Sequence, residues 1–140
     1  MRRPSQAQPL CEEARAGRFG FPVDNTIGGT PQRNSWSAEG GTLGWVNFFA
    51  EQRLRPQCAL TQERALQRLG EALCARLPEL FEGVPDVRPA TLHGDLWSGN
   101  IAAADGAPVV FDPAAYYGAR AALLLRACAA AESSNVLTLL

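Results

Sequence analysis

Three oxygen-bearing side chains follow one another in the second half of the sequence with a spacing typical of phosphoryl transfer. Asp95 lies two residues after His93 and five before Asn100, and Asp112 follows twelve residues later. In the pattern H-x-D-x-x-x-x-N, the aspartate accepts the proton of the attacking hydroxyl, while the asparagine and a later aspartate hold magnesium. The spacing predicts Asp95 as catalytic base, Asn100 and Asp112 as metal ligands, and ATP and Mg2+ as cofactors.

A β-hairpin is predicted between the two metal ligands. Two short apolar runs flank Asp105-Gly106, which is a strong signal for a tight turn. Folding back at this turn brings Asn100 beside Asp112, with the loop of Asp95 at the mouth of the hairpin. Taken singly, each of these residues is as well explained as a cap or turn former. Their occurrence together at this spacing favours a catalytic and metal-binding site.

Two other residues of the loop are expected to support it. His93 could act as a general acid or base. The favoured role is a histidine that holds the backbone of the loop through hydrogen bonds. Trp97 is expected to pack beneath the loop.

The motif LHGDLWSGN (residues 92–100), with FDPA (111–114) and YYG (116–118), resembles the fructosamine kinase family, also called ketosamine or protein-ribulosamine 3-kinases. A second block, residues 24–32 and 45–57, is similar to the stretch upstream of that motif in the family. The resemblance covers residues 19–118 and implies a protein-kinase-like fold of the aminoglycoside-phosphotransferase branch. It implies ATP-dependent phosphorylation of the sugar 3-hydroxyl of a ketosamine, which destabilises the glycation adduct.

The resemblance also implies how the chain is organised. The expected class is α+β: part of a helical C-terminal lobe, with a short hairpin carrying the metal ligands and without the N-terminal lobe. Residues 1–18 are expected to be disordered, residues 19–118 to form the partial lobe, and residues 119–140 to form a divergent Ala/Leu-rich tail able to make a helix. The sequence contains no lysine, whereas such kinases hold the phosphates with one. We therefore expect negligible kinase activity from this polypeptide alone.

The stretch over residues 19–44, rich in Gly, Pro, Asn, Ser and Thr, is predicted to be a loop. A phosphate-binding loop at Gly28-Gly29-Thr30 is disfavoured because no lysine follows. The resemblance implies that residues 24–32 are a loop of the helical lobe, and Asp24 and Asn25 are candidates for contact with the substrate.

Two helices and a strand are predicted upstream of the motif. Residues 43–54 have helical apolar spacing stopped by Pro56, with Trp45, Phe48 and Phe49 in the core. A second helix is expected to be capped by Thr61 and ended by Pro78. Its expected core positions are residues 65, 66, 69, 72, 73 and 77. A strand at residues 90–92 would enter the catalytic loop.

Composition excludes several classes of protein. With 140 residues, 46% hydrophobic content and a net charge of −1, the chain is one domain or part of one, and nothing suggests nucleic acid or an anionic membrane. Four scattered cysteines and one histidine do not have zinc-site spacing. The cysteines indicate an intracellular protein, cytoplasmic as first choice, with plastid and mitochondrion left open.

The expected partner is a glycated protein or a small ketosamine, and the sequence gives no oligomeric state. Two alternatives stay open. The chain could be a non-catalytic fragment or binding module that pairs with another chain. It could also belong to another small-molecule phosphotransferase, acting on aminoglycosides or choline, because the catalytic motif is shared.

Overall fold

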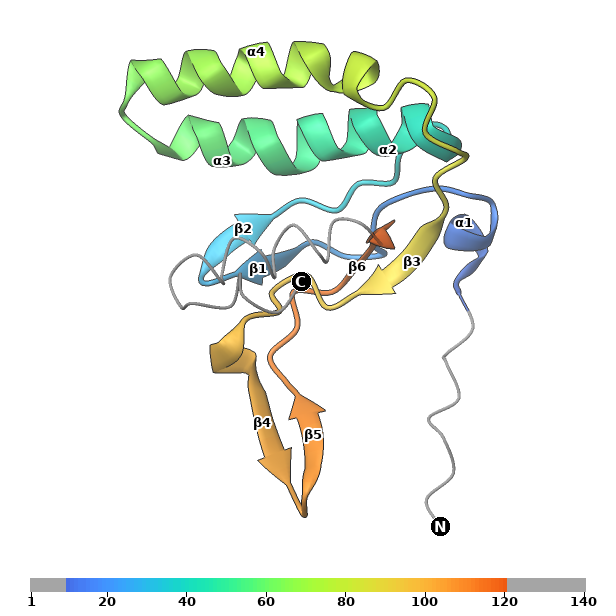
Figure 1. The fold of residues 1–140 in the computed structure, drawn as a ribbon, viewed down its shortest axis with the longest axis vertical. Helices are drawn as coiled ribbons and strands as arrows, with labels where there is room; N and C mark the ends of the chain where they lie inside the picture. The colour runs from blue at the N-terminus through green and yellow to red at the C-terminus, as the bar shows by residue number, and fades with distance from the viewer. Residues whose placement is uncertain (1–9, 121–140) are drawn as a thin grey trace.

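The structure, a computed structural model, describes residues 10–120 (Figure 1). These residues form a layer of helices above three separate two-stranded antiparallel sheets. The helical elements are α1 (Glu12–Arg15), α2 (Gly41–Phe49), the π-helical turn η1 (Ala50–Leu54), α3 (Arg55–Leu60), α4 (Arg64–Leu80) and the 3-10 turn η2 (Ser98–Asn100). The strands are β1 (Asn25–Ile27), β2 (Thr30–Gln32), β3 (Pro89–Leu92), β4 (Ile101–Ala104), β5 (Ala107–Val110) and β6 (Tyr116–Ala119). The mixture of helices and small sheets confirms the predicted α+β class.

The helical layer is a hairpin of two long arms, because α4 runs back alongside α2, η1 and α3 (Figure 1). We expected Pro56 to end the first helix, which is wrong: the chain continues through η1, and Pro56 occupies the first turn of α3. Pro56 has no N–H to donate, and the helix accommodates it directly after the π-helical turn η1 instead of ending there. Pro78 likewise lies inside α4, which continues to Leu80.

The start and the packed face of α4 also differ from the prediction. Glu63, not Thr61, is the N-cap residue, while the Thr61 hydroxyl accepts a hydrogen bond from the Glu63 N–H at 3.1 Å. Cys74 and Leu77 are buried against the first arm. In contrast, three expected core leucines are 42–65% exposed, namely Leu66, Leu69 and Leu73. The helical period was correct, but within residues 10–120 nothing covers this side of the helix.

The main core joins α2 to the sheet formed by β3 and β6. It consists of buried Phe19, Trp45, Phe48, Leu92, Tyr116 and Ala119. Trp45 and Phe48 are each 3% exposed, and Phe49 packs against the cluster, so their predicted place in the core is confirmed. This core fixes the two strands that lead into and out of the candidate site.

The described residues extend into both segments that were expected to flank the partial lobe. Residues 10–18 contain α1, and Arg18 forms an ion pair with Glu13 at 2.9 Å. Ala119, the first residue of the expected tail, is buried at the end of β6. The predicted Ala/Leu helix in residues 121–140 lies outside the described residues. Every helix among residues 10–120 is too short or too polar to cross a bilayer.

Candidate active site

The site begins and ends on one small sheet. The predicted strand at residues 90–92 is present as β3, and its last residue, Leu92, pairs with Tyr116, the first residue of β6. Both residues are buried in the core. Residues 93–115 therefore form one loop whose two ends are held together by strand pairing.

The predicted hairpin is present within this loop. β4 pairs with β5 in a register that runs from Ile101 opposite Val110 to Ala104 opposite Ala107. Asp105 and Gly106 have φ angles of 52° and 74°, as a two-residue type I′ turn requires. The local sequence alone therefore determines this element.

Asn100 lies at the point where the predicted site residues meet. Its side chain is buried, and its amide nitrogen donates to the Asp95 carbonyl at 2.9 Å. The same nitrogen lies 3.4 Å from the Asp95 carboxylate and 3.4 Å from the Asp112 carbonyl. The Asn100 carbonyl also accepts a hydrogen bond from the N–H of Phe111 at 3.1 Å, which extends the hairpin ladder to its open end. Asp95, Asn100 and Asp112 are thus brought together, as the spacing predicted.

The backbone at Asp112 has a left-handed conformation, with a φ angle of 54°, and Pro113 follows it. Few residues other than glycine adopt this conformation, although aspartate does so more readily than most. Such strained positions concentrate at functional sites. The backbone of Asp112 is consequently held next to Asn100, and its side chain is exposed.

The donor set fits magnesium bound together with phosphates. It offers the carboxylates of Asp95 and Asp112 and the amide oxygen of Asn100, since the amide nitrogen is engaged with the backbone. Hard oxygens suit Mg2+, which usually takes one or two carboxylates and completes its shell with water and substrate phosphates. These side chains therefore fit a Mg2+ ion that is also bound by substrate phosphates and water better than one bound by protein ligands alone.

His93 and Trp97 differ in how they support the loop. The Nε2 atom of His93 lies 2.9 Å from the carbonyl of Phe111, which links the start of the loop to the end of the hairpin. This is the kind of backbone contact that we expected. Trp97 is 50% exposed, and its indole lies over Gly99. Half of its surface is thus exposed, so Trp97 covers the backbone of the loop at Gly99 and does not pack beneath it as expected.

Asp24 and Asn25 lie in a polar network behind the site. The Asp24 carboxylate accepts the N–H of Asn34 at 2.7 Å. The Asn25 amide donates to the Ala115 carbonyl at 2.9 Å and accepts from Gln32 at 2.8 Å. These hydrogen bonds give both side chains a structural role within the lobe. Gln32 and Asn34 are buried, and we missed them because a sequence does not distinguish a buried amide from an exposed one.

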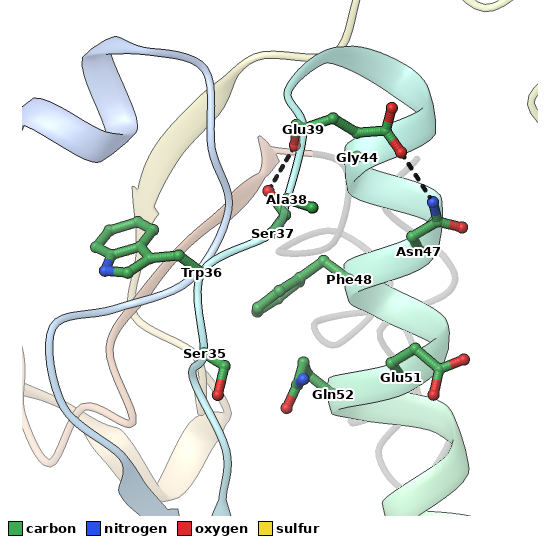
Figure 2. Close-up of a pocket in the computed structure, with 10 residues that line it drawn as sticks. All are labelled: Ser35, Trp36, Ser37, Ala38, Glu39, Gly44, Asn47, Phe48, Glu51 and Gln52. Atoms are coloured by element: carbon green, nitrogen blue, oxygen red, sulfur yellow. Dashed lines mark hydrogen bonds between the residues drawn. The ribbon is translucent and has the colours of Figure 1, made fainter.

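A pocket of about 190 Å³ lies elsewhere, between the segment that precedes α2 and the helix itself (Figure 2). Its walls are held by the Ser37 hydroxyl, which donates to the Glu39 carbonyl at 2.6 Å, and by the Asn47 amide, which donates to the Glu39 carboxylate at 3.2 Å. The pocket is lined by residues 35–39, 44, 47, 48, 51 and 52. None of the residues predicted from the motif lines this pocket. The candidate active site is therefore the loop at residues 93–115, which includes the β4–β5 hairpin.

Comparison with known proteins identifies the family. A profile described as fructosamine kinase matches residues 7–125. Over 118 residues the chain is 45% identical to the chloroplastic protein-ribulosamine 3-kinase of Arabidopsis thaliana, covering 78% of this chain and 34% of that protein. Over 112 residues it is 39% identical to the ketosamine-3-kinase of Mus musculus, covering 77% and 34%. The chain belongs to the fructosamine kinase family, which confirms the resemblance seen in the motifs.

Solved structures agree with this assignment. A candidate fructosamine-3-kinase of Thermobifida fusca superposes with a TM-score of 0.61 at 31% identity, over 92% of this chain and 53% of that one. The chain spans about a third of the length of the curated relatives it matches.

Proposed function

We propose that this chain carries the catalytic base and metal ligands of an ATP-dependent 3-kinase for ketosamines, such as the ribulosamines and fructosamines of glycated proteins. The observation that supports it is the Asn100 amide, whose nitrogen lies between 2.9 and 3.4 Å from atoms of Asp95 and Asp112. Phosphorylation at the sugar 3-hydroxyl would destabilise the adduct and so repair it. An intracellular location, in cytoplasm or plastid, stays a prediction.

Each side chain has a distinct role in this proposal. The Asp95 carboxylate accepts the proton of the sugar hydroxyl as its oxygen attacks. Asn100 orients the Asp95 backbone through its amide nitrogen, and its oxygen would hold Mg2+ together with the Asp112 carboxylate. Bound Mg2+ and ATP would supply the phosphoryl group and neutralise its charge. His93 holds the start of the loop against the Phe111 carbonyl.

We further propose that these 140 residues alone phosphorylate ketosamines at a negligible rate. Kinases of this fold hold the ATP phosphates with a lysine, and the sequence has none. The chain would then supply the base and the metal ligands, while the phosphate clamp would have to come from another part of a longer protein or from another chain.

The site is tested by divalent cation binding, with Mn2+ as an electron-paramagnetic probe in place of Mg2+. Asp112→Asn should weaken Mn2+ binding, in the presence of ATP, by at least tenfold, because it removes a charged ligand. Asp86→Asn is the matched control, because it changes an exposed carboxylate upstream of β3 that pairs with Arg88 and has no contact with the predicted metal ligands. Equal Mn2+ binding by wild type, Asp112→Asn and Asp86→Asn would refute the metal site.

Activity distinguishes the remaining alternatives. The purified chain is assayed with ATP and a panel consisting of a fructosamine, a ribulosamine, an aminoglycoside and choline. Phosphorylation of a ketosamine that Asp95→Ala abolishes would contradict the expected inactivity of the chain alone while supporting Asp95 as the base. Phosphorylation of the aminoglycoside or choline alone would refute the substrate class.

A further inference from the structure

Backbone carbonyls after the strained Asp112 are held by amide side chains. The carbonyl of Asp112 lies 3.4 Å from the Asn100 amide, as described above. The carbonyl of Ala114 accepts from Gln32 at 3.1 Å, and that of Ala115 accepts from Asn25 at 2.9 Å. Gln32 and Asn25 belong to the β1–β2 hairpin, more than eighty residues earlier in the chain. The segment that follows the predicted metal ligand is therefore fixed from two sides.

The Ala114 carbonyl also contacts the catalytic loop. Gly94, which immediately precedes Asp95, has a φ angle of 80°, and a Cβ atom at this position would overlap the oxygen of Ala114. The backbone of Gly94 thus packs directly on the carbonyl that Gln32 holds. Ala114 itself is 2% exposed, so no water layer separates the two segments. A shift of this carbonyl would move the loop of Asp95 and the segment of Asp112 relative to each other.

Gln32 is itself held rigidly. It is 6% exposed, and its nitrogen donates to the Asn25 amide oxygen at 2.8 Å as well as to Ala114. Asn34, which is fully buried, donates to the same Asn25 oxygen at 3.1 Å and accepts from Arg53 at 2.7 Å. Each amide has its partners in a buried network, so the hydrogen bond to Ala114 has a defined direction and little freedom to relax.

We infer that Gln32 is a positioning residue for the phosphotransfer site: through the Ala114 carbonyl it sets the placement of the Asp95 loop against the segment of Asp112. The inference rests on the proposed function, because it assigns Gln32 a role in the geometry of that site. Groups that hydrogen-bond a metal ligand directly typically change the metal affinity by about 10- to 100-fold when they are replaced, and Gln32 acts one step further away, through the backbone at Ala114, so its effect should lie at or below the low end of that range.

The test compares Gln32→Met with Gln67→Met. Methionine has nearly the length of glutamine but no N–H donor. Gln67 is a matched control because its amide also donates to a backbone carbonyl, that of Thr61 at 2.9 Å, far along the chain from the motif. Gln32→Met should weaken Mn2+ binding in the presence of ATP by up to about tenfold, whereas Gln67→Met should leave it unchanged.

Hydrogen exchange provides a readout that needs neither metal nor activity. The N–H groups of Asn100 and Phe111 donate within the site, to Trp97 at 3.0 Å and to Asn100 at 3.1 Å. Their exchange should be about tenfold faster in Gln32→Met, because local opening becomes easier, while exchange within α4 should stay as in wild type. If Gln32→Met does not fold, Gln32→Asn provides the same comparison, since its amide is one methylene too short to keep the hydrogen bond to Ala114.

The outcomes separate the two ideas. Unchanged exchange at Asn100 and Phe111 in the Gln32 variants would overturn the positioning role, as would an equal acceleration throughout the described residues. Mn2+ binding that is insensitive to Asp112→Asn would instead overturn the proposed metal site, while the exchange result would still decide whether Gln32 orders the loop.

Discussion

Gly94→Ala is the substitution for which the structure gives the sharpest expectation. Gly94 has a left-handed backbone, with a φ angle of 80°, and an added Cβ atom would lie inside the van der Waals radius of the Ala114 oxygen. Two separate penalties therefore act at one position. The first is the backbone conformation itself, and the second is the overlap with a buried carbonyl that cannot move without breaking its hydrogen bond from Gln32.

The magnitude follows from adding the two penalties. A left-handed conformation costs an L-residue about 1–2 kcal/mol. Overfilling a packed site costs about 1–3 kcal/mol. Gly94→Ala should thus lower the free energy of unfolding by about 2–5 kcal/mol, a large part of the total of about 5–15 kcal/mol typical of a folded domain.

Alanine substitutions at two other glycines allow the backbone penalty to be measured without the overlap penalty. Gly83 and Gly106 have φ angles of 76° and 74°, but a Cβ atom at either position would meet nothing within 4 Å. Gly83→Ala and Gly106→Ala should therefore show only the backbone penalty of about 1–2 kcal/mol. Urea unfolding followed by tryptophan fluorescence reports the difference, since Trp45 is buried in the main core. A Gly94→Ala variant no less stable than the other two would refute the close contact between Gly94 and Ala114.

Three other predictions follow from the same structure. Asn100→Leu should lower the free energy of unfolding by about 1–3 kcal/mol, measured by urea titration, because the Asp95 carbonyl loses the amide that donates to it at 2.9 Å; an unchanged midpoint would contradict this. Asp112→Gly should leave stability unchanged or raise it by up to about 1 kcal/mol in a thermal melt while Mn2+ binding is lost, since glycine adopts the φ angle of 54° without strain; a large loss of stability would contradict it. Burial raises the pKa of the Cys74 thiol above its ordinary value of 9.0. The stabilisation that comes from keeping this thiol neutral in the folded state is therefore fully present below pH 9.0 and is lost as the pH rises through the folded-state pKa. In Cys74→Ala, the urea midpoint should fall less steeply than in the wild type as the pH rises above about 9. An identical fall in both proteins would contradict the raised pKa of Cys74.

The elements that could be predicted are those determined by local chemistry. Asp105-Gly106 specifies a two-residue turn because both positions need positive φ angles, and the structure has them. The pairing that follows from this turn brings Asn100 next to Asp112 without any distant contact. For the same reason, the spacing of the motif was enough to predict that Asp95, Asn100 and Asp112 are neighbours, with Asp112 in contact through its backbone carbonyl.

The features that could not be predicted depend on distant partners. Pro56 and Pro78 were read as helix ends, but whether a proline ends a helix depends on its place within the turns, which the spacing of apolar residues does not show. Asn25 stays a candidate for contact with the substrate, but its hydrogen-bond partners within the chain could not be predicted. Its actual partners include a carbonyl ninety residues away, and only the tertiary fold brings the two together.

The ladder between β4 and β5 has a consequence for how the length of this region can vary. Adding one residue to each strand would lengthen the arm by a further cross-strand pair while leaving Asn100 and Asp112 together at its open end. Adding a single residue to one strand would force a bulge or reverse which side of the ribbon its side chains occupy. Homologous chains should therefore differ in this interval by even numbers of residues, and an odd difference should be accompanied by a bulge.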